Sequence, residues 1–413
     1  MNAADLDGFF AARAALDAEA YLELDYTLEC RGDPRAAAAH LCSEQSTAQW
    51  ARVGVDEDFR PRFAAKVVAL DAEPIAAFSL PLPGTEDGSG PRYRVRITIA
   101  HPHGNFGARI PNLLSAVLGE GVFHVPGIPL VRLEDIRFPP AYLAQFPGPQ
   151  FGVAGLRELL GAHDRPIFLG VVKPNIGLAP SAFAELAEQA WMGGLDIAKD
   201  DEMLADAEWS PLRERARAMD GARRRAESAT GARKLYLANV TDEVSRLVAL
   251  HDIAVTEGAG ALLVNALPVG LSGLRMLREH SRLPIFAHFP MIAALTRVPG
   301  YGVHPRVFTT LQRMCGADAV ITPGFGDRMM VPDDDVMANV RACLGPLGTL
   351  KSALPVPGGS DSAESLPRVY ARIGTRDFGF VCGRGIFGHA AGPRGGAASV
   401  REAWTRLAAG AAS

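Results

Sequence analysis

Residues Gly193–Glu202 read GGLDIAKDDE, a short apolar run that stops in four consecutive charged residues. Such a run predicts a buried strand, on which alternate side chains share one face. Lys199 and Asp201 then point one way and Asp200 the other, while Glu202 lies where the turning chain brings it back beside Asp201. A lysine between two acids is either a salt-bridged cluster or one wall of a metal site. For this segment alone the salt bridge is the commoner arrangement, so the position of the segment in the chain has to decide.

The segment belongs to a series of similar runs. After a proline-rich stretch at residues 139–149, apolar runs alternate with helix-like segments to the end of the chain. This alternation is typical of βα units, and eight units in about 250 residues predict a C-terminal (β/α)8 TIM barrel. The eight runs are residues 166–174, 196–202, 234–241, 261–267, 284–290, 319–325, 350–359 and 378–389.

Polar residues gather where these predicted strands end, and the strand starts show no such concentration. Chemistry in TIM barrels takes place at the C-terminal ends of the strands, so this distribution predicts an active site there. A purely structural barrel would not need polar groups that converge at one mouth. The strand-end residues are Lys173; Lys199, Asp201 and Glu202; Asn239 and Thr241; Asn265; His288; Thr322; Gly358, Gly359 and Ser360; and Gly383, Arg384 and Gly385.

The N-terminal part has a different pattern and predicts a small α+β domain. The whole chain has 413 residues, which is too long for one ordinary core, and we place domains at residues 1–135 and 136–413. Arginines alternate with apolar residues along Tyr93–Ala100, which indicates a sheet with one solvated face. We expect helices at residues 1–20 and Pro34–Leu41, strands at Tyr21–Cys30, Lys66–Leu70, Ile75–Leu80 and Tyr93–Ala100, and a turn at Pro81–Pro91.

Composition excludes several classes of function. A hydrophobic content of 48%, with 21% charged residues and a net charge of −4, is that of a soluble globular protein and gives no reason to expect nucleic-acid binding. No apolar run approaches the ~20 residues needed to span a bilayer, so we expect no membrane association. The five cysteines are scattered and form no Cys-x-x-Cys pair, which fits reduced thiols in a cytoplasmic protein.

The charged strand end offers only two carboxylates as it stands. Mg²⁺ prefers hard oxygen ligands in octahedral geometry. If the Lys199 amine adds CO₂, the carbamate becomes a third anionic oxygen ligand beside Asp201 and Glu202. His288 is placed to hydrogen-bond a metal ligand or a substrate hydroxyl, although a satisfied core histidine is the structural alternative.

Two further strand ends carry candidate binding groups. Pro174 rules out a continuing ladder bond, so Lys173 lies at a strand terminus, as a proton donor or acceptor or as a charge at the barrel rim. Gly358 and Gly359, together with the Gly383–Gly385 segment, end the seventh and eighth strands, where barrels bind phosphate through backbone N–H groups. The acidic run Asp333–Asp335 follows Pro332 and fits a helix start.

These motifs identify a resemblance that runs over nearly the whole chain. The sequence resembles the large subunit of RuBisCO, and more specifically the RuBisCO-like proteins. The segments that carry the likeness are Glu44–Thr47 (EQST), Gly104–Gly107 (GNFG), Leu133–Pro139 (LEDIRFP), Gly170–Gly177 (GVVKPNIG), Gly193–Glu202 (GGLDIAKDDE) and Gly383–His389 (GRGIFGH).

The resemblance implies a set of roles. Lys199 is the lysine that carries CO₂ as a carbamate, and Lys199, Asp201 and Glu202 are the Mg²⁺ ligands. Lys173 handles protons, and His288 lies near the substrate hydroxyls. Glu44 and Asn105 match residues of the N-terminal domain that complete the active site of a partner subunit, which implies a homodimer.

Departures from the family pattern argue against CO₂ fixation. The family's second lysine is Asn175 here, and the arginine after the fifth-strand histidine is Phe289. The loop Thr322–Arg328 contains no lysine, and Pro357 replaces the serine before the strand-seven glycines. One of the two phosphate sites has thus lost its arginine, so we expect a substrate with a single phosphate and no carboxylase activity.

The remaining chemistry is the metal-assisted formation of an ene-diolate. Lys173 is retained here, whereas the RuBisCO-like enolases of methionine salvage often change this Lys-Pro motif. This favours a 3-oxo-isoapionate 4-phosphate decarboxylase or hydrolase of sugar-acid catabolism. The alternative is a 5-methylthioribulose-1-phosphate isomerase or 2,3-diketo-5-methylthiopentyl-1-phosphate enolase of methionine salvage. A non-catalytic ligand-binding or stress-related barrel and a Schiff-base aldolase that uses Lys173 remain as further alternatives.

Overall fold

The computed structural model describes residues 3–49, 56–82, 89–125 and 127–410. The chain forms two compact units: Met1–Phe146 with Ile292–Phe308, and Pro147–Met291 with Thr309–Ser413. The division falls at Phe146/Pro147 and gives Ile292–Phe308 to the first unit, whereas the sequence predicts a single boundary at 135/136. Within the described ranges, no helix is long and apolar enough to cross a membrane.

The first unit is built on a five-stranded sheet in the order β10-β4-β1-β3-β2. β1 pairs with β3 and β4, and β2 pairs with β3, all antiparallel; β10 pairs with β4 in parallel. Along β3, Val95, Ile97 and Ile99 are buried while Arg96 is exposed, so the sheet has the expected solvated face. α2 packs against β1, β2 and β3. The strands are β1 (Tyr21–Arg31), β2 (Lys66–Ile75), β3 (Arg92–Pro102), β4 (Leu130–Arg137) and β10 (Gly302–Val303).

Short helices complete this unit. Where the sequence predicts a helix over Pro34–Leu41, α2 runs from Pro34 to Glu44, with the Asp33 side chain accepting from the Arg35 N–H as its N-cap. The others are α1 (Ala3–Asp7), η1 (Arg13–Ala15), α3 (Arg60–Phe63), η2 (His103–Asn105), α4 (Ile110–Val117), α5 (Gly121–His124), α6 (Pro140–Leu143) and α13 (Ile292–Thr296).

Two N-terminal predictions are wrong. The expected helix over residues 1–20 ends as α1 at Asp7, because the following backbone pairs with the start of β2: Val67 N donates to Phe9 O at 2.7 Å. The expected strand Ile75–Leu80 is absent, since β2 runs unbroken from Lys66 and ends at Ile75. Beyond it, the Ser79 N–H donates to the Glu29 carboxylate at 2.7 Å instead of to a neighbouring strand. Most of the expected turn Pro81–Pro91 lies outside the described residues.

The second unit is the predicted parallel barrel. Its eight strands are all parallel, in the order β12-β11-β9-β8-β7-β6-β5-β13, and β12 also packs against β13, so that the ring is nearly closed. All eight strands fall within the predicted runs. They are β5 (Ile167–Val171), β6 (Ile197–Lys199), β7 (Leu235–Asn239), β8 (Ala261–Asn265), β9 (Ile285–His288), β11 (Ala319–Pro323), β12 (Leu354–Gly358) and β13 (Gly379–Cys382).

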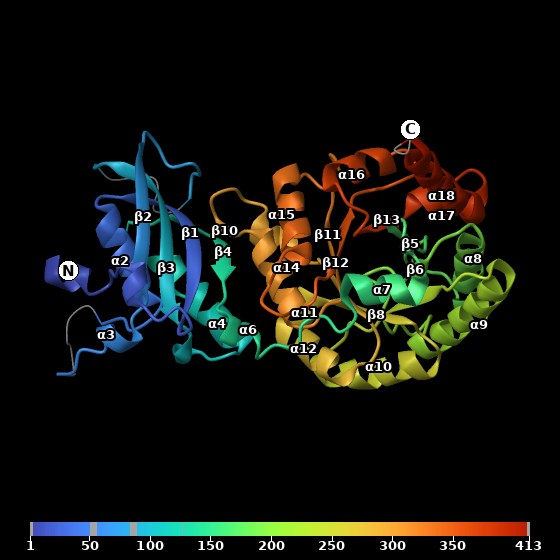
Figure 1. The fold of residues 1–413 in the computed structure, drawn as a ribbon, viewed down its shortest axis with the longest axis horizontal. Helices are drawn as coiled ribbons and strands as arrows, with labels where there is room; N and C mark the ends of the chain where they lie inside the picture. Colours follow the sequence, from blue (N-terminus) through green and yellow to red (C-terminus); the bar gives the residue numbers. More distant parts are fainter. Residues whose placement is uncertain (1–2, 50–55, 83–88, 126, 411–413) are drawn as a thin grey trace. The chain divides into compact units, whose positions relative to one another are not determined.

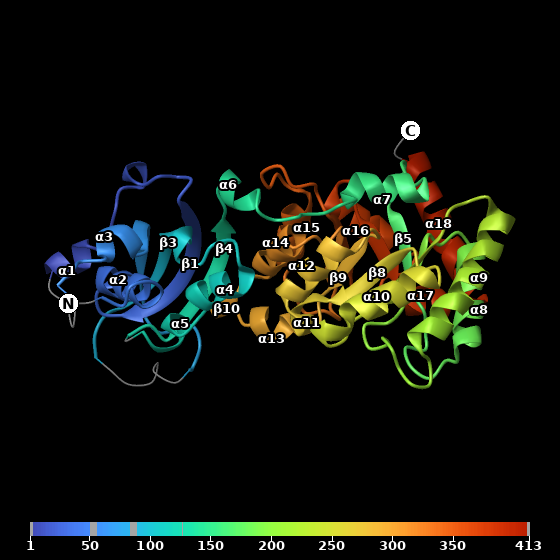
Figure 2. The ribbon, with the colours of Figure 1, turned by 90° about the horizontal axis from the view of Figure 1, so that it is seen from below.

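Helices surround these strands (Figures 1 and 2). Inside the ring, apolar side chains such as Leu169, Leu237, Phe286 and Val356 form one core cluster. The helices are α7 (Gly152–Leu160), α8 (Pro180–Met192), α9 (Leu212–Thr230), η3 (Val244–Arg246), α10 (Leu247–Thr256), α11 (Ala266–Val269), α12 (Leu271–His280), α14 (Pro305–Met314), α15 (Asp333–Leu344), α16 (Leu366–Ile373), α17 (Arg384–Phe387) and α18 (Gly392–Gly410).

Two minor predictions concern residues outside the site. Asp333 begins α15 and pairs with Arg372 at 2.6 Å, so the acidic run is a helix start. All five cysteines are buried free thiols. Burial raises the pKa of the Cys315 and Cys343 thiols to about 12, so they stay protonated at neutral pH.

Candidate active site at the barrel mouth

The C-terminal ends of the barrel strands surround a cavity of roughly 770 Å³. All of the residues that line it belong to the second unit. The structure places around one cavity all the barrel residues to which the sequence assigns a catalytic, metal-binding or phosphate-binding role: Lys173, Lys199, Asp201, Glu202, His288, Gly358, Gly359, Gly383, Arg384 and Gly385. The other strand-end residues Asn239, Thr241, Asn265 and Thr322 are not among the residues that line it. Glu44, at the end of α2, and Asn105, at the end of η2, lie in the first unit.

Lys199 is the last residue of β6 and is 1% exposed. Its Nζ atom has no hydrogen-bond partner among the described residues. Burial lowers the pKa of this amine, the nearby Glu202 and Asp201 carboxylates act in the opposite direction, and Lys173 lowers it further. A buried amine without a partner is costly unless it is neutral or modified, so Lys199 is poised to be a nucleophile.

Asp201 is already in contact with the second lysine of the mouth. Lys173 Nζ lies 2.7 Å from Asp201 Oδ2 and also donates to Asn175 Oδ1. The Lys173 side chain is 27% exposed, whereas that of Asp201 is 1% exposed. Lys173 therefore neutralises a buried carboxylate while its own ammonium reaches the cavity. The salt bridge that the sequence offers as an alternative for Lys199 is not formed by its Nζ atom, and Asp201 pairs with Lys173 instead.

His288 ends β9 and faces Glu202, with 3.7 Å between Nε2 and the Glu202 Oε2 atom. The Phe289 N–H donates to His288 Nδ1 at 2.9 Å, so Nδ1 is an acceptor and the ring proton of the neutral form is on Nε2. Burial holds the pKa of His288 well below its usual value, and Lys199 and Lys173 lower it further. His288 is thus a neutral donor at the mouth.

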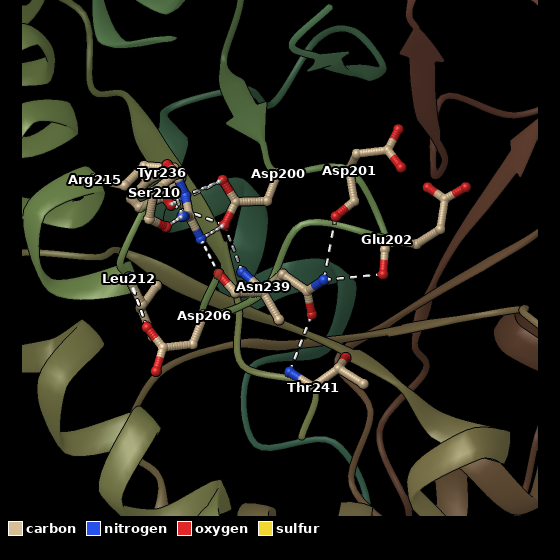
Figure 3. A network of polar contacts seen from close by, with 11 residues as sticks. Asp200, Asp201, Glu202, Asp206, Ser210, Leu212, Arg215, Tyr236, Asn239 and Thr241 are labelled. Carbon is tan, nitrogen blue, oxygen red and sulfur yellow. Dashed lines mark hydrogen bonds and ion pairs between the residues drawn. The ribbon is translucent and has the colours of Figure 1, made fainter. Parts of the chain in front are cut away.

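The neighbouring Asp200 points away from the mouth, as expected, and anchors the loop (Figure 3). Asp200 is fully buried and accepts hydrogen bonds from Arg215 Nε at 3.1 Å, from the Tyr236 hydroxyl at 2.8 Å and from the Asn239 N–H at 2.8 Å. This network ties β6, β7 and α9 together behind the acidic loop.

Two asparagines then hold the backbone of the acidic loop. Asn239 Nδ2 donates to the carbonyls of Asp201 and Glu202, both at 3.1 Å, and Asn265 Nδ2 donates to the Glu202 carbonyl at 2.9 Å. These contacts fix where the two carboxylates leave the backbone. The strand-end asparagines are therefore positioning residues, and such partners tune the affinity of metal ligands.

The glycine-rich strand ends bring the backbone close to neighbouring chain. A Cβ atom on Gly359 would lie 2.5 Å from the Phe325 carbonyl oxygen, and one on Gly385 would lie 2.5 Å from the Asp361 carbonyl oxygen. Asp361 lies behind this loop, and its carboxylate accepts from the Gly359 N–H at 3.3 Å. Side chains at these glycines would not fit, which leaves backbone groups as the lining of this end of the cavity.

Arg328 and Met329 line the cavity, although the sequence does not single them out as site residues; Ser360, one of the strand-end residues, lines it as well. Arg328 Nη1 donates to the Ser360 hydroxyl at 2.5 Å, and both residues are exposed at the mouth. The signal was present, because Arg328 is the only basic residue in the loop that was noted for lacking lysine. Arg215 and Tyr236 gave no signal, since an arginine in the sequence RERAR reads as a solvated helix face.

A parallel barrel with an amine, two carboxylates and a neutral histidine at its mouth defines a class of TIM-barrel enzyme site. Residues 152–412 match the model of the ribulose bisphosphate carboxylase large chain, catalytic domain, and residues 26–142 match that of its N-terminal domain. The chain belongs to the RuBisCO large-chain family.

Within that family, the chain is similar to the RuBisCO-like proteins. It is 64% identical to ribulose bisphosphate carboxylase-like protein 2 of Rhodopseudomonas palustris, over 99% of this chain and 95% of that protein. It is 62% identical to a ribulose bisphosphate carboxylase-like protein of Allochromatium vinosum, over 99% and 90% of the two chains. A 3-oxo-isoapionate-4-phosphate decarboxylase of Rhizobium rhizogenes is 32% identical over 93% of this chain and 92% of its own.

Solved structures agree. A rubisco-like protein from Burkholderia fungorum has a TM-score of 0.87 at 30% identity and covers 95% of each chain. Octameric Rubisco from Pyrococcus horikoshii has a TM-score of 0.85 at 30% identity over 97% of this chain and 90% of its own. Dimeric Rubisco from Hyperthermus butylicus has a TM-score of 0.84 at 28% identity, over 98% and 94%. The expected fold is thereby confirmed.

Proposed function

We propose that this protein is a Mg²⁺-dependent enzyme that forms an ene-diolate from a keto-sugar or keto-sugar acid with one phosphate. The observation that carries the proposal is the Lys199 amine, which is buried, unpaired among the described residues and next to the Asp201 and Glu202 carboxylates. Burying an amine without a hydrogen-bond partner costs stability, which is the reason to assign Lys199 a chemical role.

The residues present fit a metal site once Lys199 is modified. The neutral amine nitrogen attacks the carbon of CO₂ and loses one proton, which leaves a carbamate anion. Lys199, Asp201 and Glu202 then offer three anionic oxygen ligands, the donor set that Mg²⁺ prefers. When bound, Mg²⁺ supplies Lewis-acid stabilisation of negative charge on adjacent substrate oxygens.

The remaining mouth residues divide the other tasks. Lys173 carries protons at the edge of the cavity, so it is placed to reprotonate an ene-diolate carbon. His288 presents its Nε2 proton and orients a substrate hydroxyl. The glycine-lined backbone at Gly358–Gly359 and Gly383–Gly385 takes the phosphate. Phe289 also lines the cavity, and its uncharged ring gives no second phosphate site, so we propose no ribulose bisphosphate carboxylase activity.

The particular reaction that we propose is decarboxylation of 3-oxo-isoapionate 4-phosphate. Relatives that are 32–33% identical over most of this chain carry that name. Arg328 supports a sugar-acid substrate, because a guanidinium at the mouth suits a carboxylate and has no role towards a methylthio group. The bond to the carboxylate breaks, CO₂ leaves, its electron pair stays as the ene-diolate, and Lys173 returns a proton to carbon.

The test is an assay of the purified protein with two substrates in the presence of MgCl₂ and bicarbonate. We expect CO₂ release from 3-oxo-isoapionate 4-phosphate and no turnover of 5-methylthioribulose 1-phosphate. Lys199→Ala is expected to lose this activity while it keeps the wild-type circular dichroism spectrum. Lys199 lies at the C-terminal end of β6 and is not part of the apolar core cluster. Turnover of the methylthio compound alone would reverse the assignment, and hydrolysis without CO₂ release would change the reaction class.

We also propose that the active unit is a homodimer or a larger assembly of dimers. The solved relatives include an octameric and a dimeric Rubisco. In this arrangement Glu44 and Asn105 of the partner complete the barrel site. Full activity of a monomer would oppose it.

A further inference from the structure

A second cluster of metal-ligating side chains lies on the helices outside the barrel. His251 and Asp252 are neighbours on α10, and His280 is the last residue of α12. Asp252 Oδ1 lies 2.8 Å from His251 Nδ1 and 3.0 Å from His280 Nε2. One donor atom from each residue lies within 4.8 Å of the other two, and among the described residues this is the one such group of three His, Cys, Asp or Glu side chains.

The surroundings of the cluster favour a cation. Asp252 Oδ1 lies within hydrogen-bond distance of His251 Nδ1 and of His280 Nε2, so the carboxylate stands between two imidazoles, which are metal-ligating groups themselves. His280 also ends α12, and the negative end of a helix dipole attracts positive charge.

One of the three side chains is buried and the other two are exposed to solvent. His251 is only 6% exposed, and its Nε2 atom has no partner in the part of the chain that the structure describes. The side chains of Asp252 and His280 are 59% and 40% exposed, so an ion and its remaining waters have access. The two imidazole rings meet edge to face, with centroids 4.6 Å apart.

We propose that His251, Asp252 and His280 bind a divalent transition metal, with Zn²⁺ as the best match. Two imidazoles and a carboxylate are a common Zn²⁺ donor set with a fourth position left to water. The site joins α10 to α12, which pack against each other on the outside of the barrel. None of the three residues lines the barrel-mouth cavity, so this proposal does not depend on the proposed function.

The test is a ZnCl₂ titration of the full-length protein by calorimetry, with MgCl₂ in large excess to occupy the barrel-mouth site. We expect His280→Ala to bind Zn²⁺ at least about tenfold more weakly than the wild type at this site. Asp252→Asn keeps the side-chain volume and is expected to show the same loss. His163→Ala removes an exposed histidine elsewhere in the same unit and is the matched control.

A second readout is stability, since a ligand that binds only the folded state raises the Tm. Zn²⁺ is expected to raise the Tm of the wild type and of His163→Ala, and not that of His280→Ala or Asp252→Asn. If all four proteins bind Zn²⁺ with the same stoichiometry and affinity, or if the wild type binds none, the site does not exist.

Discussion

At the scale of single residues, Lys173 has two simultaneous roles that can be separated by kinetics. Its ammonium lies 2.7 Å from a buried Asp201 oxygen and is also exposed to the cavity. A residue that moves a proton in the transition state contributes to kcat more than to binding. We expect Lys173→Met to lower kcat by about 10² or more while KM changes little. Steady-state kinetics on the sugar-acid substrate measure both, and an unchanged kcat with a raised KM would make Lys173 a binding residue.

Asp361 gives a pH-dependent prediction. Burial raises its pKa to about 6, while the Ser365 and Gly359 hydrogen bonds act in the opposite direction. Because the folded-state pKa exceeds the unfolded one, the folded protein holds the extra proton between them. This contribution to stability is complete below the unfolded pKa and is lost as the pH rises through about 6.

Asp361→Asn is expected to remove that loss. The amide keeps the volume, can accept from the Gly359 N–H and can donate to the Ser365 hydroxyl. The full pKa shift corresponds to about 3 kcal/mol, and most of it is expressed above pH 4, so the free energy of unfolding of the variant should gain on that of the wild type by about 2 kcal/mol between pH 4 and pH 7.5. Urea unfolding across this range measures the gain, and parallel curves for the two proteins would contradict it.

Some residues at the barrel mouth could be predicted from the sequence, and others could not. Lys173, Lys199 and His288 were predictable because each directly follows an apolar run, and Asp201 because it lies two residues beyond Lys199; the ends of such runs meet at the mouth of a barrel. Arg328 comes from a long loop, whose path no local pattern predicts. The pairing of Lys173 with Asp201, which leaves Lys199 alone, depends on side-chain distances that a sequence does not contain.

At the scale of elements, the acidic loop after β6 is held by hydrogen bonds from β7. Asn239 donates to the carbonyls of both Asp201 and Glu202. Asn239→Ala should therefore loosen both carboxylates, and we expect the Mg²⁺ concentration for half-maximal activity to rise by about 10-fold or more. Tyr236→Phe is the matched control, since it removes a bond to Asp200 but leaves the asparagine contacts intact. If Asn239→Ala and the wild type require the same Mg²⁺ concentration, Asn239 does not position the two carboxylates.

Strands could be predicted from the sequence where both of their faces are buried. Parallel barrel strands are covered on both sides, so they read as continuous apolar runs, and all eight were found. The first 20 residues contain apolar side chains at helical spacing, but pairing of Phe9 and Ala11 with Val67 replaces the helix. That pairing joins segments far apart in sequence, which local periodicity cannot register.

At the scale of the whole molecule, one segment crosses the simple division of the chain. Ile292–Phe308 belongs to the first unit, where β10 pairs with β4 through Gly302 and Val303. A strand of two residues has no measurable period, so the sequence predicted only a single boundary. The first unit is therefore completed by a segment that follows β9 of the barrel in the sequence.

The proposed sharing of sites between subunits makes a prediction that neither unit makes alone. Suppose that Lys199 acts in one subunit and Glu44 in its partner. A Lys199→Ala homodimer and a Glu44→Gln homodimer then have two defective sites each, and both should be inactive. In a hybrid, one site collects both changes, while the other combines an intact barrel with an intact N-terminal domain.

Co-expression of the two variants with different affinity tags provides the measurement. Random pairing makes about half of the dimers hybrids with one intact site each, so the mixture should recover about a quarter of the wild-type activity. Purification through both tags should raise this to about half, because it removes the inactive homodimers. A hybrid without activity would place Glu44 and Lys199 in the site of the same chain, and a fully active Glu44→Gln homodimer would remove Glu44 from the site altogether.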